Sequence, residues 1–162
     1  MKTHRYIHSR LMPQITIDFP EEDEEREILD RMGGRRIPTV SPVTELERLE
    51  QAREAMHSIY VDYRIKEYVV RLVHATRSPS VYQIDLEGLL QYGASPRATL
   101  YLNLASRANA MLHGRAYATP QDVKEVAHDV LCHRVILTYE AEAEETTSDD
   151  VITHVLNEIP VP

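Results

Sequence analysis

Three consecutive residues, Ser95-Pro96-Arg97, have types and spacing that suit the binding of an anion. Serine is a favoured N-cap residue, and proline at the next position sacrifices no hydrogen bond, so the pattern predicts a helix start. The first turn of a helix has free N–H groups and a positive dipole, and a guanidinium adds a planar fork of donors. The spacing therefore indicates an anion-binding helix start. The alternative is an ordinary capped helix with Arg97 in solvent.

The histidines and the cysteine do not form a recognisable metal site in the sequence. His128 and Cys132 are four residues apart and would share one face of a helix, and His133 follows directly. A third or fourth ligand at a fitting spacing is missing, so we expect packing and helix-end hydrogen bonds and no metal. His4 and His8 are also four apart, in a segment without periodic pattern. Ser95, Tyr101 and Ser106 have no histidine and aspartate partners at a recognisable spacing, so no nucleophilic site is predicted.

Six short segments follow one another along the chain, at residues 68–77, 93–98, 110–117, 119–123, 130–135 and 155–162. In order and spacing they resemble the C-terminal lid of the MoxR branch of AAA+ ATPases. The letters G-A-S-P-R-A resemble the second-sensor helix of that family. The other segments resemble a helix ending in A-T-R, a turn A-x-x-x-G-R-x-Y, a helix start T-P-Q-D-V, a helix end V-L-x-H-R and a closing segment. The first motif is at residues 93–98, and the others are, in the order just given, at residues 68–77, 110–117, 119–123, 130–135 and 155–162. The resemblance covers roughly residues 10–162.

The resemblance implies roles for individual residues. Arg97 corresponds to the second-sensor arginine, which reaches the γ-phosphate of bound ATP, and Ser95 lies beside it in the nucleotide site. Arg10 corresponds to a candidate arginine finger, although the residues before it depart from the family pattern. Arg77 and Arg115 also match family positions, and we expect these two to form structural ion pairs.

The nucleotide-binding core of such an ATPase is not found in this sequence. None of the five glycines lies in a G-x-x-x-x-G-K-[ST] loop, and no apolar strand ends in an Asp-Glu pair that could hold magnesium. Phosphoryl transfer needs both a phosphate cradle and a metal site. We therefore expect no ATP hydrolysis by this chain alone and no ATP or Mg²⁺ bound to it alone. The parent ATPase would use both.

The resemblance also implies partners. The parent would form a hexameric ring, in which the lid contacts its own ATPase core and the neighbouring subunits, and would act as a chaperone-like remodeller. Such proteins often work with a partner that carries a von Willebrand factor A domain. The alternative function is a stand-alone helical protein-interaction module without catalysis.

Composition excludes several classes of protein. The net charge of −8 argues against a nucleic-acid partner, because phosphate contacts need clustered Lys and Arg. No apolar run reaches the length of a membrane span, and the N-terminus lacks the apolar stretch of a secretion signal. Cys132 is the only cysteine, so no internal disulfide can form. These features predict a cytoplasmic protein without membrane insertion.

Periodicity and capping signals predict an all-α fold, a bundle of about five helices of the AAA+ lid type. Residues 1–19 are expected to be a disordered start and a short strand left over from the ATPase core, and residues 20–162 the helical lid domain. Helices are predicted over residues 20–32, 44–58, 63–77, 95–113 and 120–133, with a last short one after residue 149.

Shorter features of the sequence give further expectations. Thr44 and Glu47 form a capping-box pattern. Residues 134–139 are β-prone, and residues 140–148 are acidic and loop-like. The helix from Ser95 is expected to be central and buried. Its larger apolar residues lie close to one stripe, made by Leu100, Leu104, Ala108, Met111 and Leu112. Its alanines are small enough to let neighbouring helices approach closely: Ala98, Ala105, Ala108 and Ala110.

Overall fold

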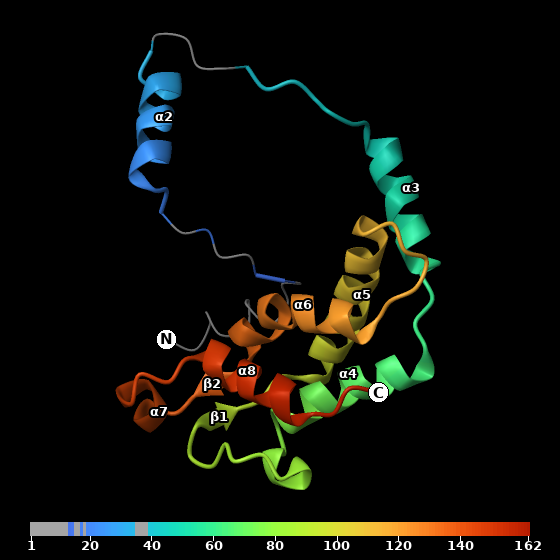
Figure 1. The fold of residues 1–162 in the computed structure, drawn as a ribbon, viewed down its shortest axis with the longest axis vertical. Coiled ribbons are helices and arrows are strands. Elements are labelled where there is room, and N and C mark those ends of the chain that lie inside the picture. Colours follow the sequence, from blue (N-terminus) through green and yellow to red (C-terminus); the bar gives the residue numbers. More distant parts are fainter. Residues whose placement is uncertain (1–12, 15–16, 18, 35–38) are drawn as a thin grey trace. The chain divides into compact units, whose positions relative to one another are not determined.

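The computed structural model describes residues 13–14, 17, 19–34 and 39–162 (Figure 1). In this part of the chain there are seven α-helices, two short 3-10 helices and one two-stranded sheet. The predicted all-α fold is therefore confirmed. Two compact units are described separately, residues Ile15–Arg53 and a unit that includes residues 54–162. Of the strand predicted within residues 1–19, only residues 13, 14, 17 and 19 are described, and none of these four is assigned to a strand. Arg10 lies outside the described residues.

The first unit contains α2 (Glu22–Met32) and the beginning of α3 (Leu46–His57). A capping box between Glu21 and Glu24 and an acidic first turn start α2, which suits the positive end of a helix dipole. No residue of α2 is buried. The predicted Thr44 cap is wrong by one position, because the Leu49 N–H donates to the Glu45 carbonyl and α3 begins at Leu46.

The second unit has a core enclosed by α4 (Tyr63–Ala75), α5 (Pro96–Leu112), α6 (Pro120–Leu131) and α8 (Ser148–Glu158) (Figure 1). Local signals start these helices. The Asp62 carboxylate accepts the Arg64 N–H at 2.9 Å at the start of α4, and proline is the first residue of α5 and of α6. The largest fully buried side chains are Tyr68, Leu72, Leu102, Leu131, Ile152 and Ile159.

Helix α5 is buried through a different face from the one predicted. Leu100 and Leu112, two members of the expected stripe, are 64% and 85% exposed. The residues buried in α5 are Ala98, Leu102, Ser106 and Ala110, each four positions after the last. Small side chains on this face permit close packing against α4 and α6. The expected stripe is therefore wrong at Leu100 and Leu112, whereas Ala98 and Ala110, which were expected to let neighbouring helices approach closely, are buried.

Short elements complete the second unit. Strands β1 (Leu90–Tyr92) and β2 (Ile136–Leu137) pair antiparallel, which confirms the β-prone segment. The 3-10 helices are η1 (Pro79–Tyr82) and η2 (Cys132–Arg134). The expected loop over residues 140–148 is wrong at its start, because the Thr138 hydroxyl accepts the Ala141 N–H at 3.1 Å and starts helix α7 (Tyr139–Ala143). None of the helices in the described part of the chain combines the length and apolar composition needed to cross a membrane.

Candidate functional site

The start of α5 carries the residues that the sequence singled out. Ser95 occupies the N-cap and Pro96 the first helical position, as predicted. The Ser95 hydroxyl, however, receives no capping hydrogen bond. The Ala98 N–H, which that hydroxyl would normally accept, donates instead to the Ser95 carbonyl at 2.9 Å. The Ser95 side chain is exposed and stays available for another partner.

A buried hydrogen bond fixes this helix start to the end of α4. The Thr76 hydroxyl accepts the Ala94 N–H at 2.9 Å and donates to the Val73 carbonyl at 2.8 Å. Thr76 and Ala94 are both buried, so leaving either group unpaired would cost about 1–3 kcal/mol. The Ala-Thr-Arg end of one helix therefore holds the Gly-Ala-Ser-Pro-Arg start of another.

Gly93 permits this contact. A Cβ atom at this position would lie 2.1 Å from the Thr76 carbonyl oxygen and 2.8 Å from Cγ of Arg77. Only glycine lets the two backbone segments approach so closely. The sequence analysis gave Gly93 no role of its own, because the need for it arises from a contact 17 residues back along the chain.

Three arginines belong to the segments that meet at the start of α5. Arg97 lies in its first turn, Arg77 extends past Gly93, and Arg134 comes from η2. Arg134 is largely buried, with its guanidinium 4.8 Å from the centroid of the Tyr101 ring. Burial lowers the pKa of Arg134, Tyr101 opposes this shift, and the nearby charge of Arg97 adds to it. Positive charge is therefore concentrated where an anion would be stabilised.

Arg97 and Arg77 are exposed, and neither pairs with a carboxylate of the described residues. The predicted ion pair of Arg77 is therefore wrong for this part of the chain, since its side chain lies along the Gly93 backbone. Two guanidiniums without acidic partners beside one fixed helix start can bind phosphate through their planar donors. The sequence analysis named Arg97 but did not group it with the other arginines, which lie 20 and 37 positions away.

Arg115, at the opposite end of α5, confirms the predicted ion pair. Its two terminal nitrogens donate to the two oxygens of the Asp122 carboxylate at 2.6 and 2.5 Å. Asn109 and Thr119 donate to the same carboxylate, at 2.9 Å from the amide and 2.7 Å from both the Thr119 N–H and hydroxyl. Burial alone raises the pKa of Asp122, but these hydrogen bonds outweigh it and hold the pKa far below its usual range. We call these four residues the Asp122 clamp.

The residues weighed as metal ligands lie near the end of α6. His128 and Cys132 are neighbours, as expected from their spacing, and Asp149 of α8 joins them. Burial and the charge of Asp149 raise the pKa of the Cys132 thiol to about 12, so the thiol is a poor nucleophile in this state. His4 and His8 lie outside the described residues.

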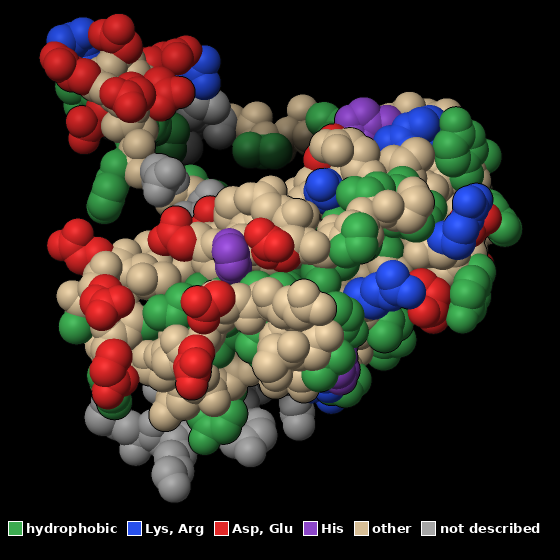
Figure 2. All heavy atoms as spheres, turned by 60° about the horizontal axis from the view of Figure 1, so that its bottom comes forward, with side chains coloured by type: hydrophobic (Ala, Val, Ile, Leu, Met, Phe, Trp, Pro, Cys, Tyr) green, Lys and Arg blue, Asp and Glu red, His purple; other side chains and the backbone are tan. Residues whose placement is uncertain are grey.

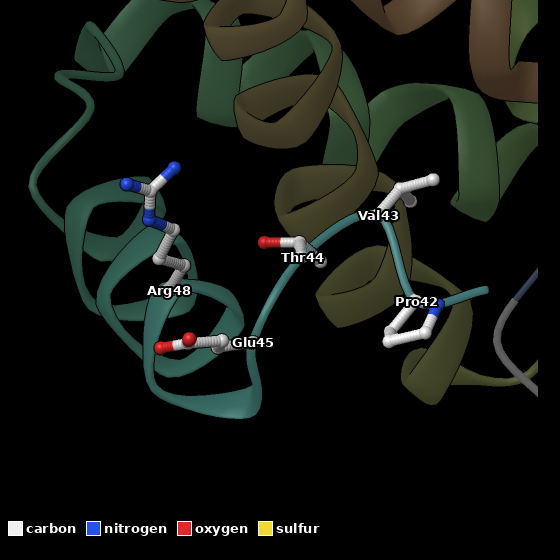
Figure 3. A pocket seen from close by; sticks show the side chains of 5 residues that line it. All are labelled: Pro42, Val43, Thr44, Glu45 and Arg48. Atoms are coloured by element: carbon white, nitrogen blue, oxygen red, sulfur yellow. The ribbon is translucent and has the colours of Figure 1, made fainter.

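A hollow in the first unit carries no comparable chemistry. Figure 3 shows it at the bend of the chain that leads into α3. It is lined by Pro42, Val43, Thr44, Glu45 and Arg48. All five residues are exposed, and the acid and the base come from one short stretch of chain. The start of α5 is the stronger candidate site.

Comparisons with known proteins show the family to which the chain is related. The AAA lid domain family matches residues 86–155. The chaperone MoxR1 of Mycobacterium tuberculosis is 39% identical over 154 residues, which cover 94% of this chain and 41% of that protein. The protein MoxR of Methylorubrum extorquens is 35% identical over 128 residues, covering 74% of this chain and 37% of that protein.

A solved structure matches the fold closely. It belongs to a proposed ATPase of Cytophaga hutchinsonii, with a TM-score of 0.90 and 31% sequence identity, covering 98% of this chain and 48% of that one. This chain spans less than half the length of each of these three proteins. The matched lid residues and the MoxR relatives along nearly the whole chain show that the chain belongs to the MoxR family of AAA+ ATPases and carries its helical lid domain.

Proposed function

We propose that this lid contributes Arg97 to an ATP-hydrolysing site, where the guanidinium binds the terminal phosphate and reports the nucleotide state. The observation that carries the proposal is the cluster of Arg97, Arg77 and Arg134 at the start of α5, with Arg97 exposed and without a carboxylate partner among the described residues. A phosphate would supply the negative charge that Arg97 and Arg77 do not receive from any carboxylate of the described residues. The Ser95 hydroxyl, which caps nothing, would donate a further hydrogen bond to the same anion.

The position of Arg97 suits a sensor because its backbone is held firmly. The Thr76–Ala94 hydrogen bond and the Gly93 contact join α5 to α4, so a pull on the Arg97 side chain acts on both helices. ATP and Mg²⁺ would be held mainly by the nucleotide-binding core of the ATPase, and the lid would close when the γ-phosphate is present. Nucleotide state would then change the angle between lid and core.

Family membership supports the wider part of the proposal. The lid would contact its own ATPase core and neighbouring subunits of a hexameric ring in the cytoplasm, and the ring would remodel client proteins as a chaperone. A partner with a von Willebrand factor A domain and an arginine finger at Arg10 belong to the same proposal. So does the division of the chain into a core strand within residues 1–19 and a lid over residues 20–162.

Substitution of Arg97 tests the proposal in the ATPase that contains this lid. Arg97→Ala should lower the turnover number for ATP by at least about tenfold, because a charged donor to the transferred phosphate is lost. Arg71→Ala is the matched control, since Arg71 is another exposed arginine, on α4, away from the start of α5. Equal ATP turnover by the Arg97→Ala and unaltered ATPases would reject the sensor role and favour a lid that serves only for protein interaction.

A further inference from the structure

Three side chains of different chemistry meet between α6 and the first turn of α8. His128 Nδ1 lies 2.7 Å from Oδ1 of Asp149, and Cys132 Sγ lies 3.6 Å from the same oxygen. Cys132 Sγ and His128 Nδ1 are 3.9 Å apart. The imidazole N–H and the thiol both direct their protons toward this one carboxylate oxygen. Two protons are thus held among three atoms that can each ligate a metal ion.

We propose that His128, Cys132 and Asp149 bind one divalent transition-metal ion of the zinc type. Thiolate sulfur, imidazole nitrogen and carboxylate oxygen are the protein ligands of Zn²⁺, at about 2.3 Å for sulfur and 2.0–2.2 Å for nitrogen and oxygen. Tetrahedral coordination at those lengths separates the ligand atoms by roughly 3.3–3.6 Å. The observed separations of 2.7, 3.6 and 3.9 Å fall on both sides of this range, so small side-chain rotations suffice. Water would take the fourth position.

Protons and charges balance when a divalent ion replaces the thiol proton. On binding, Cys132 releases its thiol proton to solvent and ligates as the thiolate. The His128 ring stays neutral and carries its proton on Nε2, which frees the Nδ1 lone pair for the metal. The two positive charges of the ion are then matched by the Cys132 thiolate and the Asp149 carboxylate. The resulting site is neutral, and it replaces a hydrogen-bonded cluster in which a carboxylate has no basic side chain beside it other than His128 among the described residues.

Packing brings the three ligands together without a metal. Helices α6 and α8 bury apolar faces in the same core, which include Ala127, Val130, Leu131, Val151, Ile152 and Val155. Thr147 caps α8, with its hydroxyl accepting the Asp150 N–H at 3.1 Å, and so fixes the turn that carries Asp149. Asp149 is 67% exposed, which gives an ion a path from solvent. Acidic side chains gather over the side of this unit that carries α7 (Figure 2), which favours the approach of a cation.

A second group of candidate ligands shows what distinguishes this one. His113, Asp122 and Glu125 also lie close together, but both oxygens of Asp122 accept hydrogen bonds from Arg115. A cation there would have to displace the Arg115 guanidinium from a buried carboxylate. At the His128 cluster, a metal displaces only protons.

Titration of the full 162-residue chain with Zn²⁺ and with Co²⁺ tests the proposal. We expect one equivalent of Zn²⁺ to bind and to raise the unfolding temperature measured against the same chain in a chelator. Co²⁺ at the same site should give a thiolate-to-cobalt charge-transfer absorption, because Cys132 is the only cysteine. A chain that gives no such absorption at saturating Co²⁺ would overturn the proposal without any substitution being made.

Variants then locate the site. Cys132→Ser and Asp149→Asn should each weaken Zn²⁺ binding by about tenfold or more, and Cys132→Ser should abolish the charge-transfer absorption. Asp149→Asn alters an exposed side chain, so it keeps the fold and separates ligation from stability. His154→Gln, an exposed histidine on the same helix α8, is the matched control and should bind as the unaltered chain does. Unchanged Zn²⁺ affinity in Asp149→Asn, or loss in His154→Gln, would reject this ligand set.

Discussion

The two ends of helix α5 use arginine in opposite ways. At the C-terminal end, both terminal nitrogens of Arg115 donate to the buried Asp122 carboxylate. At the N-terminal end, Arg97 and Arg77 extend from a rigid backbone junction and pair with no described carboxylate. Hydrogen bonds or close backbone contacts fix both ends of α5, but only the N-terminal end has arginines without a carboxylate partner among the described residues. A site for an anion needs that combination of a fixed backbone and an uncompensated cation.

Breaking the Asp122 clamp should have the largest effect on stability. Asp122→Ala removes the buried partner of Arg115 and also leaves the donors of Asn109 and Thr119 unsatisfied. We expect the free energy of unfolding to fall by about 3 kcal/mol, measured by urea denaturation. Asp129→Ala, an exposed aspartate on the same helix, is the control and should change it by less than about 0.5 kcal/mol. A fall in the free energy of unfolding of less than about 1 kcal/mol would mean that the clamp does not stabilise the C-terminal end of α5.

Adding a side chain at Gly93, at the N-terminal end of α5, should have an intermediate effect on stability. Gly93→Ala places a Cβ atom 2.1 Å from a backbone oxygen that no side-chain rotation can move. The α4–α5 junction must therefore shift. We expect the free energy of unfolding, measured by urea denaturation, to fall by about 1–3 kcal/mol. Gly34→Ala is the matched control, because a Cβ there meets nothing within 4 Å.

The same Gly93→Ala substitution sharpens the comparison of the two ends. If the junction positions Arg97, the variant lowers ATP turnover of the parent ATPase although Arg97 itself is unchanged. Full stability and full turnover in Gly93→Ala would contradict both the close contact and its role in positioning.

Acid should weaken the clamp by a smaller amount. The pKa of Asp122 is lower in the folded chain than its value of about 3.9 in an unfolded one. The clamp therefore contributes its full stability above about pH 5, and the contribution declines as the pH falls through the unfolded pKa toward the folded one. Between pH 5 and about pH 3, stability should fall more steeply in the unaltered chain than in Asp122→Asn, which cannot titrate there. Parallel pH profiles of the two proteins would show that Asp122 is not the group involved.

The sequence by itself determined the features that depend on neighbouring residues. A cap is made within about four positions, so Asp62, Thr119 and the prolines of α5 and α6 predicted where those helices begin. The order and spacing of short segments sufficed to recognise the family. The place of Arg97 in the first turn of α5 also followed from the neighbouring Ser95 and Pro96.

The tertiary structure decided which distant residues meet. Gly93 is needed because Thr76 passes beside it, and the buried face of α5 is chosen by α4 and α6 and not by the largest side chains. Asp149 joins His128 and Cys132 from another helix, so spacing along the chain could not supply the third ligand. Hydrogen bonds and ligand sets between helices depend on distances in space, which packing of the core sets and local sequence does not encode.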